Sequence, residues 1–562
     1  MRGRRTSSRL LALALTGAML LPALTGVPAL AASGYRIYTV EDLWAINNDP
    51  DGVYTLMNDL DVSEWNGGAW DPPNFSGTFY GNGHTISGVQ TKNTSAYGLF
   101  WQLSGQCTID GLTVRLGEQP VDCPVFSGGG GIAVHYTDTS PDASLTLSNC
   151  TVLGDVTISG YDAADVGGLV GSVYFNYNKA EYGTLNITGC RVEGDYIISA
   201  DGGSEVGGLI GSSIGGTGTV SGCSYAGTLR SSYLAGGLFG YLSGRHNVQE
   251  PQSTIAGCTV EGNISAWWDG EIRHDPPEDW SEPVEPARWI CAGGIAGMVS
   301  DDLTAIRDCQ VSAAVSAENS GPAEAEYSNA LAGGIVGDDN TYGKAGTISD
   351  CTVSGDVTAR GPGASAQGIG GGMVYENCIV LGDVAAYADV PGFTADAGGV
   401  AIYGGDSYSE KVACFTNCTV KGAITAESLS SDAEAAGIVA VVSDSILTDC
   451  SVYGDVTAVG KGPVATGVVD RSEAKAAGIS GGFADGVTFT RCRSYGDVTA
   501  SGPNGARASA AGVAQGFIDP TNRLVNCSAA GQIRAESGST AVEASGLLLG
   551  GGGIFRNWAF TG

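Results

Sequence analysis

The segment Thr-Ile-Ser-Asp-Cys-Thr-Val-Ser-Gly-Asp-Val at residues 347–357 decides the fold, because related copies of it return along the chain. Glycine runs accompany the copies, as in Gly-Gly-Leu-Val-Gly at residues 167–171. Self-similarity at a short period predicts a solenoid of stacked repeats. Aligned on the cysteine, the copies place one residue each in a common slot: Leu112, Cys150, Cys190, Cys223, Cys258, Cys309, Cys351, Cys378, Cys418, Cys450, Cys492, Cys527 and Trp558.

The shortest repeat separates Cys351 from Cys378, a distance of 27 residues (378 − 351). That length holds three short strands and three turns, which is one coil of a parallel β-helix. Val, Ile and Thr alternate with polar residues, as is typical of strands, and Gly and Asp interrupt them at short intervals. We therefore predict an all-β, right-handed parallel β-helix of about thirteen coils.

One series of glycines is predicted to mark a sharp corner in each coil. Only glycine reaches positive φ without a steric cost, so a fold that turns several times per coil needs many of them, and the chain has 89. The series comprises Gly168, Gly208, Gly237, Gly294 and Gly334.

The slot cysteines are predicted to be buried thiols. A slot that accepts Leu112 and Trp558 at its two ends requires an apolar side chain, and a free cysteine behaves as a small hydrophobe. Stacked coils would hold the thiols about 4.8 Å apart, beyond the usual Cβ separation of a disulfide. Neither Cys-x-x-Cys pairs nor Cys/His clusters suggest a metal site. Cys107, Cys123, Cys291 and Cys414 lie outside the slot, and a bridge between Cys107 and Cys123 is left open.

Residues 1–31 read as a secretory signal, with Arg2, Arg4, Arg5 and Arg9 before an apolar run at 10–21 and an Ala29-Leu30-Ala31 cleavage site. The apolar run is shorter than the about 20 residues that a membrane span needs. The net charge is −32, and loss of the four arginines changes it to −36. Such a surface disfavours nucleic acids and anionic lipids. We expect an extracellular protein, secreted or associated with the cell surface, with no membrane span.

After the signal, residues 32–100 are predicted to form an N-terminal cap and the first coils. Thr39 to Asn47 is a helix candidate with a capping box between Thr39 and Asp42 and an apolar face of Val40, Leu43, Trp44 and Ile46. This helix would cover the open end of the first coil, as solenoids require. Residues 101–562 form the repeats.

The segments Tyr38-Thr-Val-Glu-Asp-Leu, Asn58-Asp-Leu-Asp-Val and Phe75 to Val89, together with the Gly-Gly-Leu-x-Gly repeats, resemble GLUG-motif bacterial surface proteins. The resemblance implies an extracellular, adhesin-like protein whose repeats form a β-helix. The glycine motif weakens later, to Ala436-Gly-Ile-Val-Ala. Some IgA-cleaving metallopeptidases carry similar repeats, but this sequence lacks the His-Glu-x-x-His that their activity would require.

A long insertion at 265–290 contains four of the nine tryptophans, among acidic residues and prolines. Aromatic rings beside carboxylates suit stacking against sugars, so the insertion is a candidate glycan-binding loop; packing of the tryptophans onto the coil is the alternative. The candidate residues are Trp267, Trp268, Trp280 and Trp289.

The Gly-Asp-Val step supplies one acid in several coils, and such aligned acids could hold Ca²⁺. A local role, accepting N–H groups within a turn, is the favoured interpretation, because the acid is missing at Thr228, Asn263, Ala423 and Gln532. We therefore expect no cofactor, with calcium as the alternative. The acids are Asp155, Asp195, Asp356, Asp383, Asp455 and Asp497.

The sequence contains no recognised catalytic motif. The favoured hypothesis is a non-catalytic scaffold that binds glycan or protein partners on a host or neighbouring cell. The alternative is a β-helical polysaccharide lyase or glycoside hydrolase, which a groove with clustered acids and Lys or Arg would favour. A third interpretation is a fragment of a longer surface protein, since the chain stops at Gly562 inside an expected strand.

Overall fold

The computed structural model describes residues 34–68, 70–90, 96–117, 128–160, 164–175, 183–244, 253–270, 289–300, 304–321, 329–340, 346–404, 412–462, 472–482, 486–516, 521–538, 542–548, 554–556 and 559–560. The predicted signal at 1–31 lies outside these residues, as do Cys123, Trp280 and Trp558. No helix of the described part is long and apolar enough to cross a membrane.

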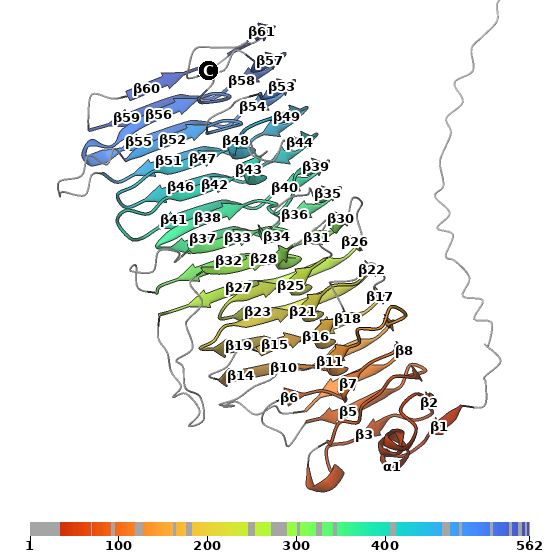
Figure 1. Cartoon of the computed structure of the whole chain (residues 1–562). Coiled ribbons are helices and arrows are strands. Elements are labelled where there is room, and N and C mark those ends of the chain that lie inside the picture. The colour runs from red at the N-terminus through yellow and green to blue at the C-terminus, as the bar shows by residue number, and fades with distance from the viewer. Residues whose placement is uncertain are drawn as a thin grey trace, which may run out of the picture.

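The chain winds into a long rod of parallel strands, with helix α1 (Val40–Trp44) at its N-terminal end (Figure 1). One sheet, here called sheet A, stacks sixteen strands from β1 (Tyr35–Ile37) to β61 (Ile554–Arg556). A second, sheet E, stacks thirteen strands from β6 (Ala96–Tyr97) to β60 (Val542–Ser545). Each strand pairs with its equivalent in the next coil, which confirms the predicted parallel β-helix.

The coil containing Cys150 shows the plan of the repeat. Its strands, in chain order, are β12 (Ser144–Ser148), β13 (Thr151–Leu153), β14 (Val156–Gly160), β15 (Ala164–Gly167) and β16 (Val170–Tyr174). The prediction of three strands per coil was wrong. The Gly-Asp step divides one face into two short strands, β13 and β14, and β16 adds a strand that belongs to a separate sheet. Even the shortest coil has four strands: β36 (Thr352–Val353), β37 (Val357–Gly361), β38 (Gly363–Gln367) and β39 (Val374–Glu376).

The slot cysteines form one buried column, as predicted. Leu112 and the eleven cysteines are each at most 1% exposed, and every cysteine of the described residues is a free thiol. Cys107 is among them, buried in β8 (Gln106–Asp110) beside Leu145 of the next coil. Burial raises the pKa of the Cys107 thiol to about 12, so it stays protonated.

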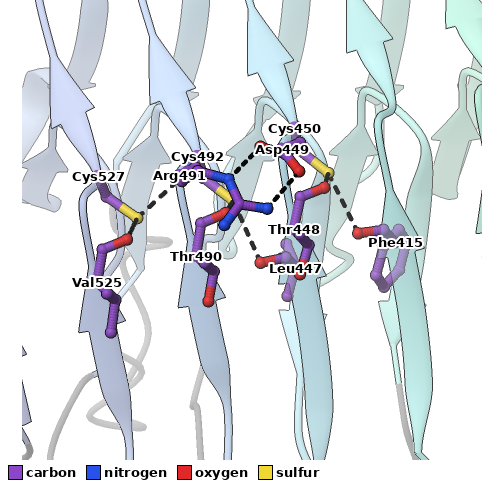
Figure 2. Close-up of polar contacts among 10 residues, drawn as sticks. All are labelled: Phe415, Leu447, Thr448, Asp449, Cys450, Thr490, Arg491, Cys492, Val525 and Cys527. Carbon is purple, nitrogen blue, oxygen red and sulfur yellow. Dashed lines mark hydrogen bonds and ion pairs between the residues drawn. The ribbon is translucent and has the colours of Figure 1, made fainter.

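The thiols also tie neighbouring coils together (Figure 2). Cys492 Sγ lies 3.4 Å from the carbonyl oxygen of Leu447 in the preceding coil and 3.7 Å from that of Thr490 in its own coil, so its single S–H is shared between the two acceptors. Cys450 repeats the pattern with Phe415, at 3.4 Å. The slot therefore selects a small apolar side chain with a weak donor, which explains why cysteine recurs there.

The residue before the slot adopts the left-handed conformation in every described coil. Glycine, Asn and Asp fill this position, in keeping with their tolerance of positive φ. Arg491 is the exception, at φ 55°. Its guanidinium donates two hydrogen bonds of 2.6 Å to the Asp449 carboxylate of the preceding coil (Figure 2). The series is Gly111, Asn149, Gly189, Gly222, Gly257, Asp308, Asp350, Asn377, Asn417, Asp449, Arg491 and Asn526.

The corner glycines are required for a different reason from the one predicted. Gly168, Gly208, Gly237, Gly294 and Gly334 do not have positive φ. A Cβ on Gly294 would instead lie 2.1 Å from the Gly334 carbonyl oxygen and 2.7 Å from Val311 Cγ1. The corners of successive coils stack too closely for any side chain, so the constraint is steric and not conformational.

The N-terminal cap has the predicted helix and capping box. Asp42 N–H donates to Thr39 Oγ1 at 3.2 Å, while Thr39 N–H donates to the Asp42 carboxylate at 3.1 Å. A 3-10 helix, η1 (Ala45–Asn48), continues α1. Leu43 and Ile46 are fully buried in the core that the first coils share, so the helix closes the end of the solenoid.

Gly294→Ala is expected to lower the free energy of unfolding by about 2–3 kcal/mol, because its Cβ would overlap the next coil. Gly257→Ala is the control: Gly257 has φ 61° and open space around its Cβ position, so the cost should be only about 1 kcal/mol. Urea unfolding followed by circular dichroism measures both. Equal losses for the two variants would contradict the steric explanation.

Candidate functional site: an aromatic pocket on the N-terminal cap

Two tryptophans line an open pocket on the N-terminal cap, together with Asn66 and Asp71. Trp44 ends helix α1 and is 40% exposed. Trp65 begins a second 3-10 helix, η2 (Trp65–Gly67), and is partly buried. The two ring centroids lie 6.3 Å apart with 34° between the planes. The indoles therefore offer an apolar surface next to an amide and a carboxylate.

The pocket rests on a rigid base. Trp70 is 1% exposed, and its indole N–H donates to the Leu99 carbonyl at 2.7 Å. Its ring lies 6.1 Å from that of Trp65. Asn66 and Gly68 both have positive φ, at 48° and 98°, so the short turn through Trp65 depends on residues that tolerate the left-handed region. Preorganisation of this kind reduces the entropic cost of binding.

The tryptophans predicted as a binding loop belong to strands where the structure describes them. Trp268 ends β27 (Thr259–Trp268) and is 6% exposed, within the core. The Arg230 guanidinium lies over the Trp267 ring at 4.1 Å. Trp289 begins β28 (Trp289–Gly293) and packs edge-on against Tyr233. The expectation was thus wrong for Trp268, whose buried ring presents no face to a ligand; Trp280 lies outside the described residues.

The aspartates of the Gly-Asp steps accept backbone N–H groups, but these groups belong to the next coil and not to the same turn. Asp155 Oδ1 accepts the N–H of Asp195 at 2.9 Å, and Asp195 Oδ1 accepts that of Thr228 at 2.7 Å. The same bonds join Asp356 to Asp383, Asp383 to Ala423, Asp455 to Asp497 and Asp497 to Gln532. The predicted role within one turn was therefore wrong. Positions without the acid, such as Thr228, still donate, which explains why the series tolerates them.

Calcium binding stays a prediction, with one oxygen of each carboxylate already accepting a backbone N–H of the next coil. Within the described ranges, no three or more His, Cys, Asp or Glu side chains are grouped so that they could hold a metal ion.

A second chemical feature is a row of side chains on the outer face of sheet E, called here the outer row. Its members occupy one register position in successive strands, three residues before each corner glycine. A third sheet, sheet D, runs from β7 (Phe100–Leu103) to β34 (Val336–Asn340) and packs against the N-terminal part of the outer row, where Leu234 and Cys291 contact Met298. The row is Asp165, Glu205, Leu234, Cys291, Leu331, Ser365, Asp396, Glu434, Lys475, Ser509 and Glu543.

Carboxyl groups stand next to each other at two places in the outer row. Burial and the neighbouring Glu205 raise the pKa of Asp165 to about 8. Burial raises the pKa of Asp396 to about 6 and that of Glu434 to about 8, against the opposing charge of Lys475. Such groups hold protons that exposed acids would release.

Clustered acids with a lysine are part of what an enzyme of this fold would need. However, Glu434 is 8% exposed, and its Oε1 lies where a Cβ on Gly481 or Gly482 would approach it to 2.9 or 3.0 Å. A polysaccharide strand would not reach a carboxyl group covered in this way.

No protein-family model matches the chain. The curated protein halomucin, from Haloquadratum walsbyi (strain DSM 16790 / HBSQ001), is 32% identical over 164 residues, which cover 25% of this chain. The match spans only 2% of halomucin. Among solved structures, a "putative immunoglobulin A1 protease" from Bacteroides ovatus aligns with 80% of this chain and 84% of its own, at 12% identity and a TM-score of 0.26.

The residues of the aromatic pocket lie close together in the sequence. Trp44, Trp65 and Trp70 fall within 27 residues (70 − 44 + 1) beside Asn66 and Asp71. Strands β2 (Val53–Leu56) and β3 (Leu60–Asp61) separate Trp44 from Trp65, so only the three-dimensional winding of the cap shows that these rings meet.

Asp165→Asn is expected to flatten the dependence of stability on pH. The folded protein holds a proton on Asp165 that the unfolded chain releases near pH 4, so stability is greatest below that pH and falls as pH rises towards about 8. The melting temperature of the wild type should fall between pH 5 and pH 8 by more than that of the variant. Asp142→Asn, at an exposed carboxylate, is the control. The same slope for wild type and Asp165→Asn would contradict the burial of this proton.

Proposed function

We propose that the protein is a non-catalytic, adhesin-like β-solenoid scaffold that acts outside the cell, secreted or at the cell surface, and binds glycans. The observation that carries the proposal is the open pocket of Trp44, Trp65, Asn66 and Asp71 on the cap. Flat rings cover the apolar faces of a sugar, while an amide and a carboxylate bind its hydroxyl groups. A few polar groups among aromatic rings are typical of small-ligand sites.

Several features support an extracellular setting. The sequence begins with a secretory signal pattern, and its net charge of −32 favours solubility while repelling anionic polymers. The similarity to part of halomucin and the resemblance of the repeats to GLUG-motif surface proteins agree with this setting. The rod would then serve to hold the cap, and loops along its length, away from the point of attachment.

The alternative, a β-helical carbohydrate-active enzyme, has one specific observation in its favour, the cluster of Asp396, Glu434 and Lys475. Hydrolysis or elimination needs carboxyl groups that flank a bound glycosidic bond. The cover over Glu434 favours a role for this cluster within the protein, so the binding scaffold is the better-supported function.

Trp44→Ala and Trp65→Ala are each expected to weaken glycan binding at least about tenfold, equivalent to about 1.4 kcal/mol, because each removes half of the aromatic surface. A glycan array identifies a ligand for the intact protein, and titration calorimetry then compares the variants. Trp267→Ala is the matched control, at a partly exposed tryptophan far along the rod.

Loss of binding in Trp267→Ala, with normal binding in both cap variants, would move the site to β27. An intact protein that bound no glycan on the array would contradict the proposed function itself.

A further inference from the structure

Glu434 and Lys475 face each other on adjacent coils of the outer row. Glu434 lies in β47 (Ala433–Ala436) and Lys475 in β52 (Glu473–Ala477), and the two residues are direct partners in the parallel register. Lys475 Nζ lies 4.0 Å from Glu434 Oε2, with side chains 22% and 10% exposed. The backbone register therefore holds an amine and a carboxyl group against each other, largely out of water.

This pair is poorly satisfied as an ordinary ion pair. A distance of 4.0 Å is too long for a hydrogen bond, and Glu434 Oε1 is buried with no hydrogen-bond partner among the described residues. A buried carboxyl group without partners is costly. A covalent bond between the two groups would remove both the charge and the unsatisfied carboxyl.

We propose that Lys475 and Glu434 form an intramolecular isopeptide bond that cross-links two neighbouring coils. Asp396, in β42 (Ala395–Gly398), is the partner of Glu434 on the opposite side from Lys475. The outer row thus aligns a carboxylate, a carboxylic acid and an amine on three successive coils. The inference is independent of glycan binding.

The reaction is a condensation that needs no other reactant. The Lys475 ammonium loses one proton, which is relayed through the intervening Glu434 carboxyl group to the Asp396 carboxylate. The neutral Nζ then attacks Cδ of the protonated Glu434 carboxyl. The Nζ–Cδ bond forms and the Cδ–Oε2 bond breaks. The departing oxygen keeps its own proton, takes a second from Nζ and leaves as water, so that one proton stays on the amide nitrogen.

The environment of Glu434 and Lys475 favours formation of the amide bond over its hydrolysis. Burial keeps Glu434 protonated near neutral pH, since its pKa is raised to about 8, and a protonated carboxyl group is the better electrophile. The register places Asp396 two coils from Lys475, with Glu434 between them, and the charge of Lys475 acts to lower the pKa of Asp396. Exclusion of water from the pair disfavours hydrolysis of the product.

The cross-link would stabilise the fold covalently, as disulfides do in many secreted proteins. Every described cysteine is a free thiol, although an exported chain can form disulfides. The glycine corner near this site has also lost its usual pattern, with Ala436 and Ala477 at the places of the first glycines. A covalent tie would therefore strengthen the coils in which the corner is altered.

Peptide mass spectrometry of the purified wild-type protein tests the proposal directly. Trypsin should fail to cut after Lys475 and should release residues 422–461 joined to residues 472–491, about 18 Da lighter than their sum, by the mass of one water. Lys475→Arg should abolish the joined peptide and lower the melting temperature. Separate peptides 422–461 and 476–491 from the wild type, with no mass loss, would overturn the proposal.

The chain contains a matched control pair. Lys461 and Glu427 also form an ion pair between neighbouring coils, but their side chains are 45% and 29% exposed. Cleavage after Lys461 should be normal, because solvent keeps both groups charged. A mass loss at both pairs would indicate dehydration unrelated to burial and would contradict the proposed mechanism, whereas loss at Lys475 alone supports it.

Discussion

The structure depends on the vertical register that backbone hydrogen bonding imposes on successive coils. Neighbouring strands of a sheet lie about 4.8 Å apart, so every side chain has the equivalent side chain of the next coil directly above it. A position in the repeat therefore describes a column and not a single site. Cysteines, corner glycines, left-handed turn residues and Gly-Asp acids each occupy one column, and each column has its own physical requirement.

These requirements differ in kind. The thiol column needs a small apolar group that can donate weakly to carbonyls of two coils. The glycine column excludes even a Cβ, because the carbonyl of the next coil would overlap it. The acid column satisfies N–H groups where the strands are interrupted. In such ladders each coil contacts only its nearest neighbours through many small interactions. The free energy of unfolding is therefore close to a sum over coils.

The architecture could be predicted from the sequence because each coil carries the same buried residues at the same positions of the repeat. The cysteine slot and the cap around Thr39 and Asp42 could be predicted, since burial and capping leave local patterns. The requirement for Gly294 was misread because a steric conflict with the next coil leaves no local trace. The left-handed position before the slot was missed, although Gly, Asn or Asp occupies it in every coil but that of Arg491.

The candidate sites were harder to predict, because they join residues that different elements supply. Trp44 and Trp65 meet only when the cap folds, and the predicted tryptophan loop proved to contribute strand residues such as Trp268. Aligning the repeats on the corner glycine would have revealed the outer row, in which Asp396, Glu434 and Lys475 fall at one register position. The functional interpretation follows from these two places: the cap supplies a surface for glycans, and the outer row supplies internal reinforcement.

The chemical state of the slot thiols tests the stacked column most directly. The purified protein, without reductant, is treated with iodoacetamide under native conditions and in denaturant, and the alkylated cysteines are identified by mass spectrometry. We expect the slot cysteines from Cys150 to Cys527 to be protected in the native protein and fully alkylated after unfolding. Slot cysteines that reacted in the native protein, or that stayed unreactive in denaturant because they form disulfides, would contradict the stacked thiol column.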